Sequence, residues 1–117
     1  MIGTNDLGYG GSVNLTFHNF TKIVSALKSA NIEVFIQFTI ECNKVSCGDR
    51  LGRIRELNRR LRAYAKSEKL TYIDLNDGLT STDEGLLSKY TYDGLHLRAN
   101  GYIKWSQAIF PYFSIPN

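Results

Sequence analysis

Apolar side chains recur at three- and four-residue steps in three segments of the chain, which span residues 13–30, 50–67 and 99–110. This spacing is typical of helices that bury one face and leave the other in water. Pro111 follows the third segment and is expected to end that helix, because proline cannot donate the next backbone hydrogen bond. The residues expected to be buried are Val13, Phe17, Phe20, Val24 and Leu27 in the first helix, Leu51, Ile54, Leu57, Leu61, Tyr64 and Ala65 in the second, and Tyr102, Trp105 and Ile109 in the third.

Two other segments are rich in β-branched and aromatic residues, and both are predicted to be strands. The clearer one spans residues 32–40, where apolar character is nearly continuous, as in a strand that is buried on both faces. The second strand is shorter and spans residues 70–75. Met1 and Ile2 look like the last residues of a further strand whose beginning would precede the chain.

Three polar segments between these elements are predicted to be loops. Residues 3–12 contain four glycines and no regular apolar period. Residues 41–48 contain both cysteines of the chain. Residues 79–92 form a longer loop, with a short helical turn expected near residues 84–88. Glycine, asparagine and aspartate favour turns because they tolerate unusual backbone angles.

Helices that alternate with buried strands indicate an α/β fold, in which helices cover both faces of a sheet of parallel strands. A chain of 117 residues is long enough for one hydrophobic core, so residues 1–117 are predicted to belong to a single domain. Functional side chains of such sheets collect at the carboxyl ends of the strands. Three segments lie at those ends: the loop of residues 3–12, the loop with both cysteines, and the long loop that carries Asp93 and His96. Residues from the first and the third can therefore meet in space.

The composition excludes some classes of protein. Apolar residues make up 43% of the chain and charged residues 21%, values that are ordinary for a globular protein. The net charge of +3 is too small to indicate nucleic-acid binding. No apolar run approaches the roughly 18 residues that a membrane-spanning helix needs, and the first residues do not resemble a signal peptide.

The most informative pair of polar residues is Asp93 and His96, which stand three residues apart just before the third predicted helix. On a helical or tightly turned backbone, side chains at this separation are neighbours. A carboxylate can then accept a hydrogen bond from Nδ1 of the imidazole, which orients the ring as a general base. The plainer interpretation of such a pair, taken alone, is a helix cap or a surface contact.

Two sequence blocks together resemble the SGNH hydrolase family, which is also called the GDSL esterases and lipases. The blocks are Gly3-Thr4-Asn5-Asp6 after a strand end and Asp93-Gly94-Leu95-His96 about ninety residues later. The resemblance covers essentially the whole chain and implies a flavodoxin-like parallel sheet. It also implies that Asn5 helps to form an oxyanion hole, that His96 is the general base and that Asp93 orients it. The implied activity is that of a carboxylic ester hydrolase with a Ser-His-Asp mechanism and no cofactor.

The chain departs from this family in one respect that matters for catalysis. The Gly-Asp-Ser block with the nucleophilic serine is absent, and so is the block whose glycine completes the oxyanion hole. The chain therefore resembles the carboxyl-terminal half to two thirds of such a domain, without its first strands. We expect the isolated chain to be inactive or nearly so, and we expect a missing N-terminal segment or a complementing chain to supply the serine.

Other candidate residues have plainer interpretations. Ser12 lies in a glycine-rich stretch that half resembles a nucleophile elbow, but we expect Ser12 or Asn14 to cap the following helix. His18 falls among polar neighbours on that helix and is expected at the surface. Cys42 and Cys47 either form a small disulfide in an exported protein or remain free thiols. Asp93, His96 and these two cysteines lack the spacing of a zinc site, and no metal is expected.

The second predicted helix contains a cluster of six arginines, at positions 50, 53, 55, 59, 60 and 62. A solvated helix face is one interpretation, and binding of anionic glycans or membrane surfaces is the other. The alternative to an esterase is accordingly a non-catalytic carbohydrate- or anion-binding module with the same fold. For an esterase, the resemblance leaves short acyl esters, acetylated sugars and lipids open as substrates. It mildly favours a secreted or periplasmic location, because many members of the family are exported.

Overall fold

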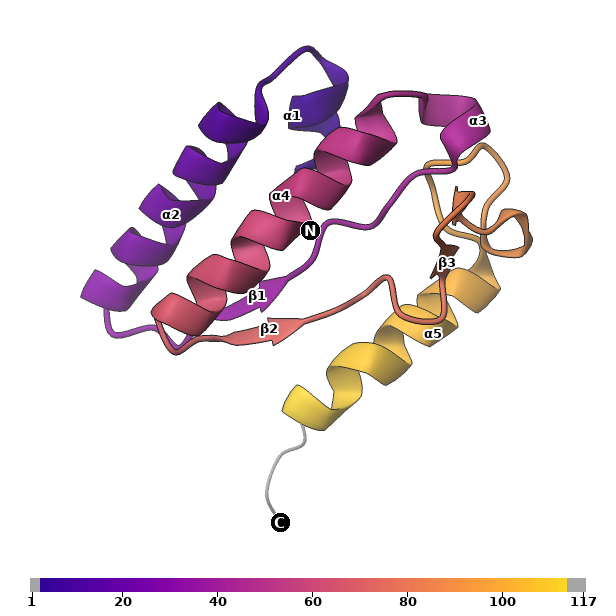
Figure 1. The fold of residues 1–117 in the computed structure, drawn as a ribbon. Helices are drawn as coiled ribbons and strands as arrows, with labels where there is room; N and C mark the ends of the chain where they lie inside the picture. The colour runs from indigo at the N-terminus through magenta and orange to yellow at the C-terminus, as the bar shows by residue number, and fades with distance from the viewer. Residues whose placement is uncertain (1–2, 114–117) are drawn as a thin grey trace.

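The computed structural model describes residues 3–113, so the predicted strand end at Met1 and Ile2 lies outside the described residues. Helices and short strands alternate along this part of the chain (Figure 1). The helices are α1 (Thr4–Gly8), α2 (Val13–Ser29), α3 (Lys44–Cys47), α4 (Arg50–Ser67) and α5 (Ala99–Ile109), with two short 3₁₀ helices, η1 (Ser88–Tyr90) and η2 (Phe110–Tyr112). The strands are β1 (Phe35–Gln37), β2 (Thr71–Ile73), β3 (Thr80–Ser81) and β4 (Gly85–Leu86).

Strands β1 and β2 form a parallel pair, in which Ile36 lies opposite Tyr72. Ile36 belongs to a hydrophobic cluster with residues of α2 and α4, whereas the neighbouring Phe35 packs into a second cluster with residues of α5. Helices α2 and α4 therefore cover one face of the pair and α5 covers the other (Figure 1). The predicted α/β class with parallel strands is confirmed.

The larger cluster lies between α4 and the sheet. Leu57 and Leu61 of α4 are fully buried in it, and Phe17 of α2 meets Tyr64 of α4 edge to face, with ring centroids 5.8 Å apart. All six residues predicted for the inner side of α4 pack into this cluster, with Tyr64 partly buried and the others fully buried. Burial of such a stripe is what keeps an amphipathic helix on a sheet.

Both predicted strands are shorter in the structure, and hydrogen bonds to side chains follow the end of β1. Just beyond β1, the Phe38 N–H still donates to the Ile73 carbonyl of β2 at 3.0 Å, and the residues after it bond to amide side chains. Asn58 accepts from the Thr39 N–H at 2.9 Å and donates to the Thr39 carbonyl at 2.8 Å, and Asn76 accepts from the Glu41 N–H at 2.8 Å. One buried and one partly buried amide side chain thus satisfy backbone groups of this segment.

The glycine-rich segment 3–12 was predicted to be a loop, and this prediction is wrong for residues 4–8, which form α1. Leu7 is fully buried among the apolar side chains of α4, and its N–H donates to the Gly3 carbonyl at 3.1 Å. Burial of one leucine outweighs the weak helix propensity of its neighbours, because tertiary packing routinely overrides local preference. Ser12 caps α2 as expected, accepting from the Leu15 N–H at 3.0 Å.

The segment 79–92 differs in part from its prediction. Strands β3 and β4 form a small antiparallel hairpin, and the short helical turn lies at η1 (Ser88–Tyr90), later than the expected residues 84–88. Leu86 is fully buried, and its N–H donates to the Cys42 carbonyl at 3.2 Å. Gly85 allows this close approach, because its φ is +70° and an added Cβ would overlap the Cys42 carbonyl. The segment therefore folds back with its apolar residues Leu79, Leu86 and Tyr90 buried in the second cluster.

Helices α2, α4 and α5 begin at the predicted residues and end within one residue of them. The expected burial of Tyr102 is wrong, because its side chain is 50% exposed. Gly101, one position earlier, is buried, and Trp105 and Ile109 face the second cluster as expected. The inner stripe of α5 thus differs from the predicted one only in its first member, where Gly101 takes the place of Tyr102.

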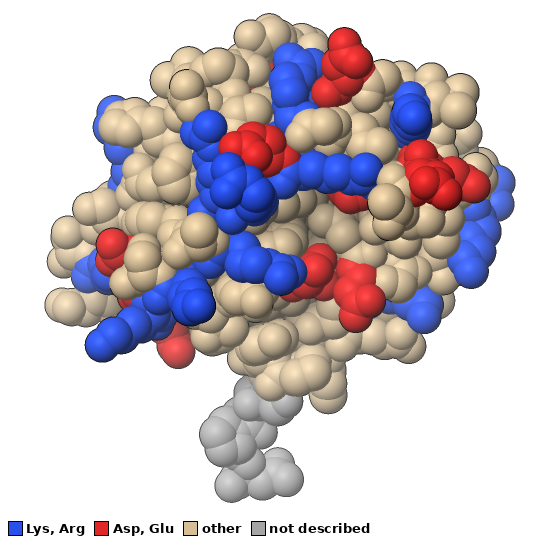
Figure 2. Space-filling model, viewed as in Figure 1, with Lys and Arg blue, Asp and Glu red and all other residues tan. Residues whose placement is uncertain are grey.

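Four of the six clustered arginines form ion pairs. The Glu41 side chain is only 9% exposed and accepts hydrogen bonds from Nε and Nη2 of Arg55. The Glu56 carboxylate forms ion pairs with both Arg59 and Arg60. Basic and acidic side chains alternate on this face of the molecule (Figure 2). The solvated and paired interpretation of this cluster is therefore favoured over a binding surface for anions.

Candidate active site

Asp93 and His96 lie in the loop between η1 and α5, and their side chains meet. His96 Nδ1 is 2.6 Å from Asp93 Oδ2. Since the acid holds the ring through Nδ1, Nε2 is left for another group. The His96 side chain is 81% exposed and that of Asp93 is 49% exposed, so the pair opens to the surface of the described residues.

Backbone groups hold the second oxygen of the Asp93 carboxylate. Oδ1 accepts from the N–H groups of Leu95 and His96, both at 2.8 Å. The backbone N–H of His96, the His96 ring and the N–H of Leu95 together hold the pKa of the Asp93 carboxyl well below its usual range, because each of them stabilises the carboxylate. Asp93 is therefore an ionised and fixed acceptor at neutral pH.

Gly94 docks the loop onto α3. Its carbonyl accepts from the Asn43 N–H at 2.8 Å, and a Cβ in its place would overlap the Ser46 side chain. Its φ is +81°, in the left-handed region that favours glycine. The loop of residues 91–98 therefore lies directly beside α3 (Figure 1).

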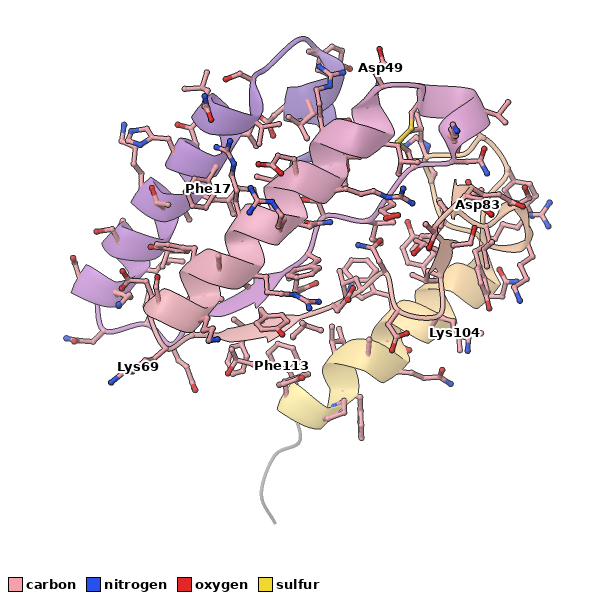
Figure 3. All side chains as sticks on the ribbon, in the orientation of Figure 1. Phe17, Asp49, Lys69, Asp83, Lys104 and Phe113 are labelled. Carbon is pink, nitrogen blue, oxygen red and sulfur yellow. A yellow bond between two sulfur atoms is a disulfide. The ribbon has the colours of Figure 1, made fainter. Side chains whose placement is uncertain are left out.

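The sequence left open whether Cys42 and Cys47 pair, and the structure contains a disulfide between them (Figure 3). Their Cα atoms are 6.2 Å apart, within the usual range for disulfides. The bridge encloses Asn43 and Ser46, the two residues against which Gly94 packs. It therefore braces the surface that carries the loop of Asp93 and His96.

Asn5, the candidate oxyanion donor, lies near the start of α1 and is exposed. Within residues 3–113, its side chain forms no hydrogen bond, and none joins it to Asp93 or His96. Both segments nevertheless adjoin the chain that leaves β1. A Cβ added to Gly3 would come within 2.7 Å of Thr39 Oγ1, and Gly94 bonds to Asn43 four residues later.

A shared apolar cluster connects the two segments. Leu7, two residues after Asn5, is fully buried in the larger cluster, and Leu95, between Asp93 and His96, packs against the same cluster. The structure thus anchors both segments to one part of the core. The roles of Asn5, Asp93 and His96 in catalysis remain predictions.

Two residues that support the loop escaped the sequence analysis. Thr91 is buried beneath the turn, and Asn43 caps α3 and also donates from its side chain to the Leu86 carbonyl at 2.9 Å. A threonine two positions before an aspartate is an ordinary combination, so no sequence signal identifies Thr91. Asn43 could have been found as a helix cap, because asparagine before a short helical run is a common start signal.

Two cavities lie near these elements. One, of about 550 Å³, is bordered by Asp93 and Gly94, with Lys44 and Asp83 among its other lining residues. The larger one, of about 980 Å³, lies between α4 and the chain that follows β2, and it contains no residue of the loop 91–98. The smaller cavity is therefore the one that adjoins the candidate site.

Other candidate residues stay outside this site. His18 is exposed on α2, as expected. Among residues 3–113, no group of three or more histidine, cysteine, aspartate or glutamate side chains is arranged to hold a metal ion. In the same range, no helix combines the length and apolar character needed to cross a membrane.

These observations define a class of protein: an α/β domain that carries an exposed Asp–His pair after its last strands. The sequence profile of the GDSL-like lipase/acylhydrolase family matches residues 1–103. The chain therefore belongs to the GDSL-like lipase/acylhydrolase family. No curated protein sequence is similar enough to the chain to count as a relative.

Solved structures agree with this family. A proposed acylhydrolase from Bacteroides fragilis is 29% identical, with a TM-score of 0.84 over 94% of this chain and 57% of that one. A GDSL-like lipase from Bacteroides thetaiotaomicron is 25% identical, also with a TM-score of 0.84, over 94% of this chain and 58% of that one. The chain thus spans less than two thirds of the length of these structures, consistent with part of a domain.

Proposed function

We propose that residues 1–117 carry the general base, its orienting acid and an oxyanion donor of a carboxylic ester hydrolase, and that the nucleophilic serine lies outside them. The observation that supports this proposal most is the 2.6 Å contact of His96 Nδ1 with Asp93 Oδ2, on a carboxylate that two backbone N–H groups already fix. A pair so oriented offers Nε2 as a base.

In the proposed reaction, His96 Nε2 takes the proton of the serine hydroxyl while the serine oxygen attacks the ester carbonyl carbon. The side-chain amide of Asn5 donates to the oxyanion that develops, a contribution of about 3 kcal/mol for one donor in comparable sites. The protonated His96 then gives its proton to the departing alcohol, and an acyl-enzyme remains. Water attacks this ester with His96 again as base, and the acid and free serine are released.

The proposed function includes a proposal about the fold, namely that the chain is part of a larger domain. We infer that residues 1–117 form a partial, flavodoxin-like domain whose first strands lie outside these residues. The exposure of His96 supports this inference, because a catalytic base works in a site from which much of the water is excluded. An N-terminal segment or a complementing chain would supply the serine and cover the pair.

We propose acyl esters as substrates, because the chain belongs to an acylhydrolase family, and short acyl esters, acetylated sugars and lipids are the candidates. The disulfide between Cys42 and Cys47 supports a secreted or periplasmic location, since disulfides persist in oxidising compartments.

The test is hydrolysis of p-nitrophenyl acetate by three proteins: the 117-residue chain, a polypeptide that also contains a Gly-Asp-Ser segment, and the His96→Ala variant of that polypeptide. We expect activity only in the second protein. If the second and third are equally active, the assignment of His96 fails. If the second folds and is inactive, a non-catalytic carbohydrate- or anion-binding module becomes the better description.

A further inference from the structure

Thr91 closes the loop that holds Asp93 and His96. It forms an isolated antiparallel bridge with Leu97, so the two ends of the loop lie side by side. Thr91 is only 6% exposed, although the side chains of Asp93 and His96 in the same loop are exposed. Its side chain is therefore inside the turn and not part of the surface.

The Thr91 hydroxyl connects backbone groups on both sides of the turn. It donates to the His96 carbonyl at 2.6 Å and accepts from the Gly94 N–H at 2.9 Å. Its distance to Asp93 Oδ1 is 3.4 Å, longer than a good hydrogen bond between oxygens. The Thr91 hydroxyl thus donates its proton to the His96 carbonyl and not to Asp93.

These contacts complete the support of the His96 residue. Its N–H donates to Asp93 Oδ1, and its carbonyl accepts from Thr91. Both peptide groups that flank the His96 Cα are therefore fixed, and the ring can rotate only about its own side-chain bonds. Loss of the hydroxyl would leave the His96 carbonyl and the Gly94 N–H without this partner, and unpaired groups of this kind are costly when buried.

We propose that Thr91 is a positioning residue, whose hydroxyl holds the His96 backbone so that the ring stays bonded to Asp93 through Nδ1. Thr91 touches neither the ring nor a substrate, and it acts through the peptide groups of the turn. The inference deepens the proposed function, because it describes how the general base of that function is held. Its test reads the ring directly and does not require catalysis.

The experiment uses the 117-residue chain labelled with ¹⁵N-histidine. The two ring ¹⁵N chemical shifts report which nitrogen of His96 carries the proton, and His18, exposed on α2, provides an internal reference. Thr91→Val keeps the shape of the side chain and removes the hydroxyl, whereas Thr91→Ser keeps the hydroxyl. The matched control is Thr80→Val, which removes another threonine hydroxyl that bonds a backbone carbonyl, that of Asn76 at 3.2 Å.

We expect His96 to be protonated at Nδ1 in the wild type, in Thr91→Ser and in Thr80→Val. In Thr91→Val, the ratio of paired to unpaired His96 rings should fall about fivefold, as expected for the loss of one hydrogen bond. An unchanged ring in Thr91→Val would overturn the proposal. Global unfolding of Thr91→Val alone would also overturn it, because the hydroxyl would then serve the whole fold. The proposed function fails separately, if Nδ1 is paired as expected and the His96→Ala polypeptide still hydrolyses the ester.

Discussion

The loop that holds Asp93 and His96 and the helix that holds Asn5 both adjoin the chain that leaves β1, but different interactions hold them. The loop is built from its own hydrogen bonds, since Asp93 accepts from two N–H groups and from the His96 ring within four residues. Helix α1 is held by Leu7, which packs against α4, while the Asn5 side chain remains exposed.

The difference separates two parts of the proposed machinery. The acid and the base are oriented by hydrogen bonds within the loop and by its docking on α3, and all of these contacts lie within the described residues. An oxyanion donor needs a reacting carbonyl and further donors around it, and α1 does not orient Asn5 toward any described partner. The proton-transfer half is therefore testable in this chain, and the oxyanion half requires the rest of the domain.

The largest expected effect is on the loop. In the polypeptide that contains the serine, His96→Ala should lower kcat by about 10⁶-fold, the loss typical of a triad histidine. His18→Ala is the matched control, because it removes the other histidine of the chain from an exposed position on α2. Steady-state hydrolysis of p-nitrophenyl acetate measures both. An equal loss of kcat in the two variants would contradict a special role of His96 in the loop.

Asp93→Asn should have the next largest effect, with kcat lower by about 10⁴-fold, because an amide at this position favours the wrong tautomer of the histidine. The variant keeps the size of the side chain, so circular dichroism should show an unchanged fold. Asp83→Asn is a suitable control. Asp83 is exposed in the loop between β3 and β4, and it lines the smaller cavity, which Asp93 also borders. A kcat within tenfold of the wild type in Asp93→Asn would contradict the role of the acid.

Asn5→Ala tests the other region and should lower kcat by about 10²- to 10³-fold, the usual cost of one oxyanion donor. KM should change little, because the bond forms chiefly in the transition state. Asn19→Ala, at an exposed position of α2, is the control. If Asn5→Ala raises KM and leaves kcat unchanged, Asn5 binds the substrate in its ground state and is not an oxyanion donor.

Reduction of the Cys42–Cys47 bridge should lower the free energy of unfolding by about 2 kcal/mol, as the chain-entropy relation gives for so short a loop. Urea unfolding of the oxidised and reduced chain measures this difference. Because the bridge encloses the residues that support Gly94, the amide signals of the loop 91–98 should shift more than those of α2. Equal shifts in both regions would mean that the bridge does not specifically brace the loop.

The smallest expected effect is the dependence of stability on pH. The pKa of Asp93 is lowered on folding, so its contribution to stability is complete above its unfolded-state pKa of about 3.9 and is lost as the pH falls through the lower folded-state pKa. Carbon-13 NMR of the carboxyl groups should show Asp93 titrating below the usual range of an aspartate. In His96→Ala, the titration should move toward the usual range, because one of the stabilising donors is gone. An unshifted Asp93 in the wild type would contradict the structure of the loop.

Much of the fold follows from the sequence because its elements obey simple periodicities. Helices α2, α4 and α5 bury regular stripes, and these were predicted to within one residue at each end. The strands were overestimated, because apolar character continues past β1 while the backbone there bonds to Asn58 and Asn76. Periodicity shows which side chains are buried, but it does not show which groups the backbone bonds to.

The candidate site was predictable where its residues are close in sequence. Asp93 and His96 meet because three residues separate them on a turned backbone. Thr91 was missed because its role depends on two backbone groups that the turn brings to it. Helix α1 was missed for a related reason, since Leu7 is buried by α4, some fifty residues away along the chain.

The central claim is that His96 and Asp93 activate a serine that lies outside residues 1–117. Labelling of the serine-containing polypeptide with a fluorophosphonate, followed by peptide mass spectrometry, tests this claim most directly, because the reagent reacts with serines that a base activates. We predict a single adduct on a serine beyond these residues in the wild type, and little or none in His96→Ala. An adduct on a serine within residues 1–117, or equal labelling of the variant, would contradict the claim.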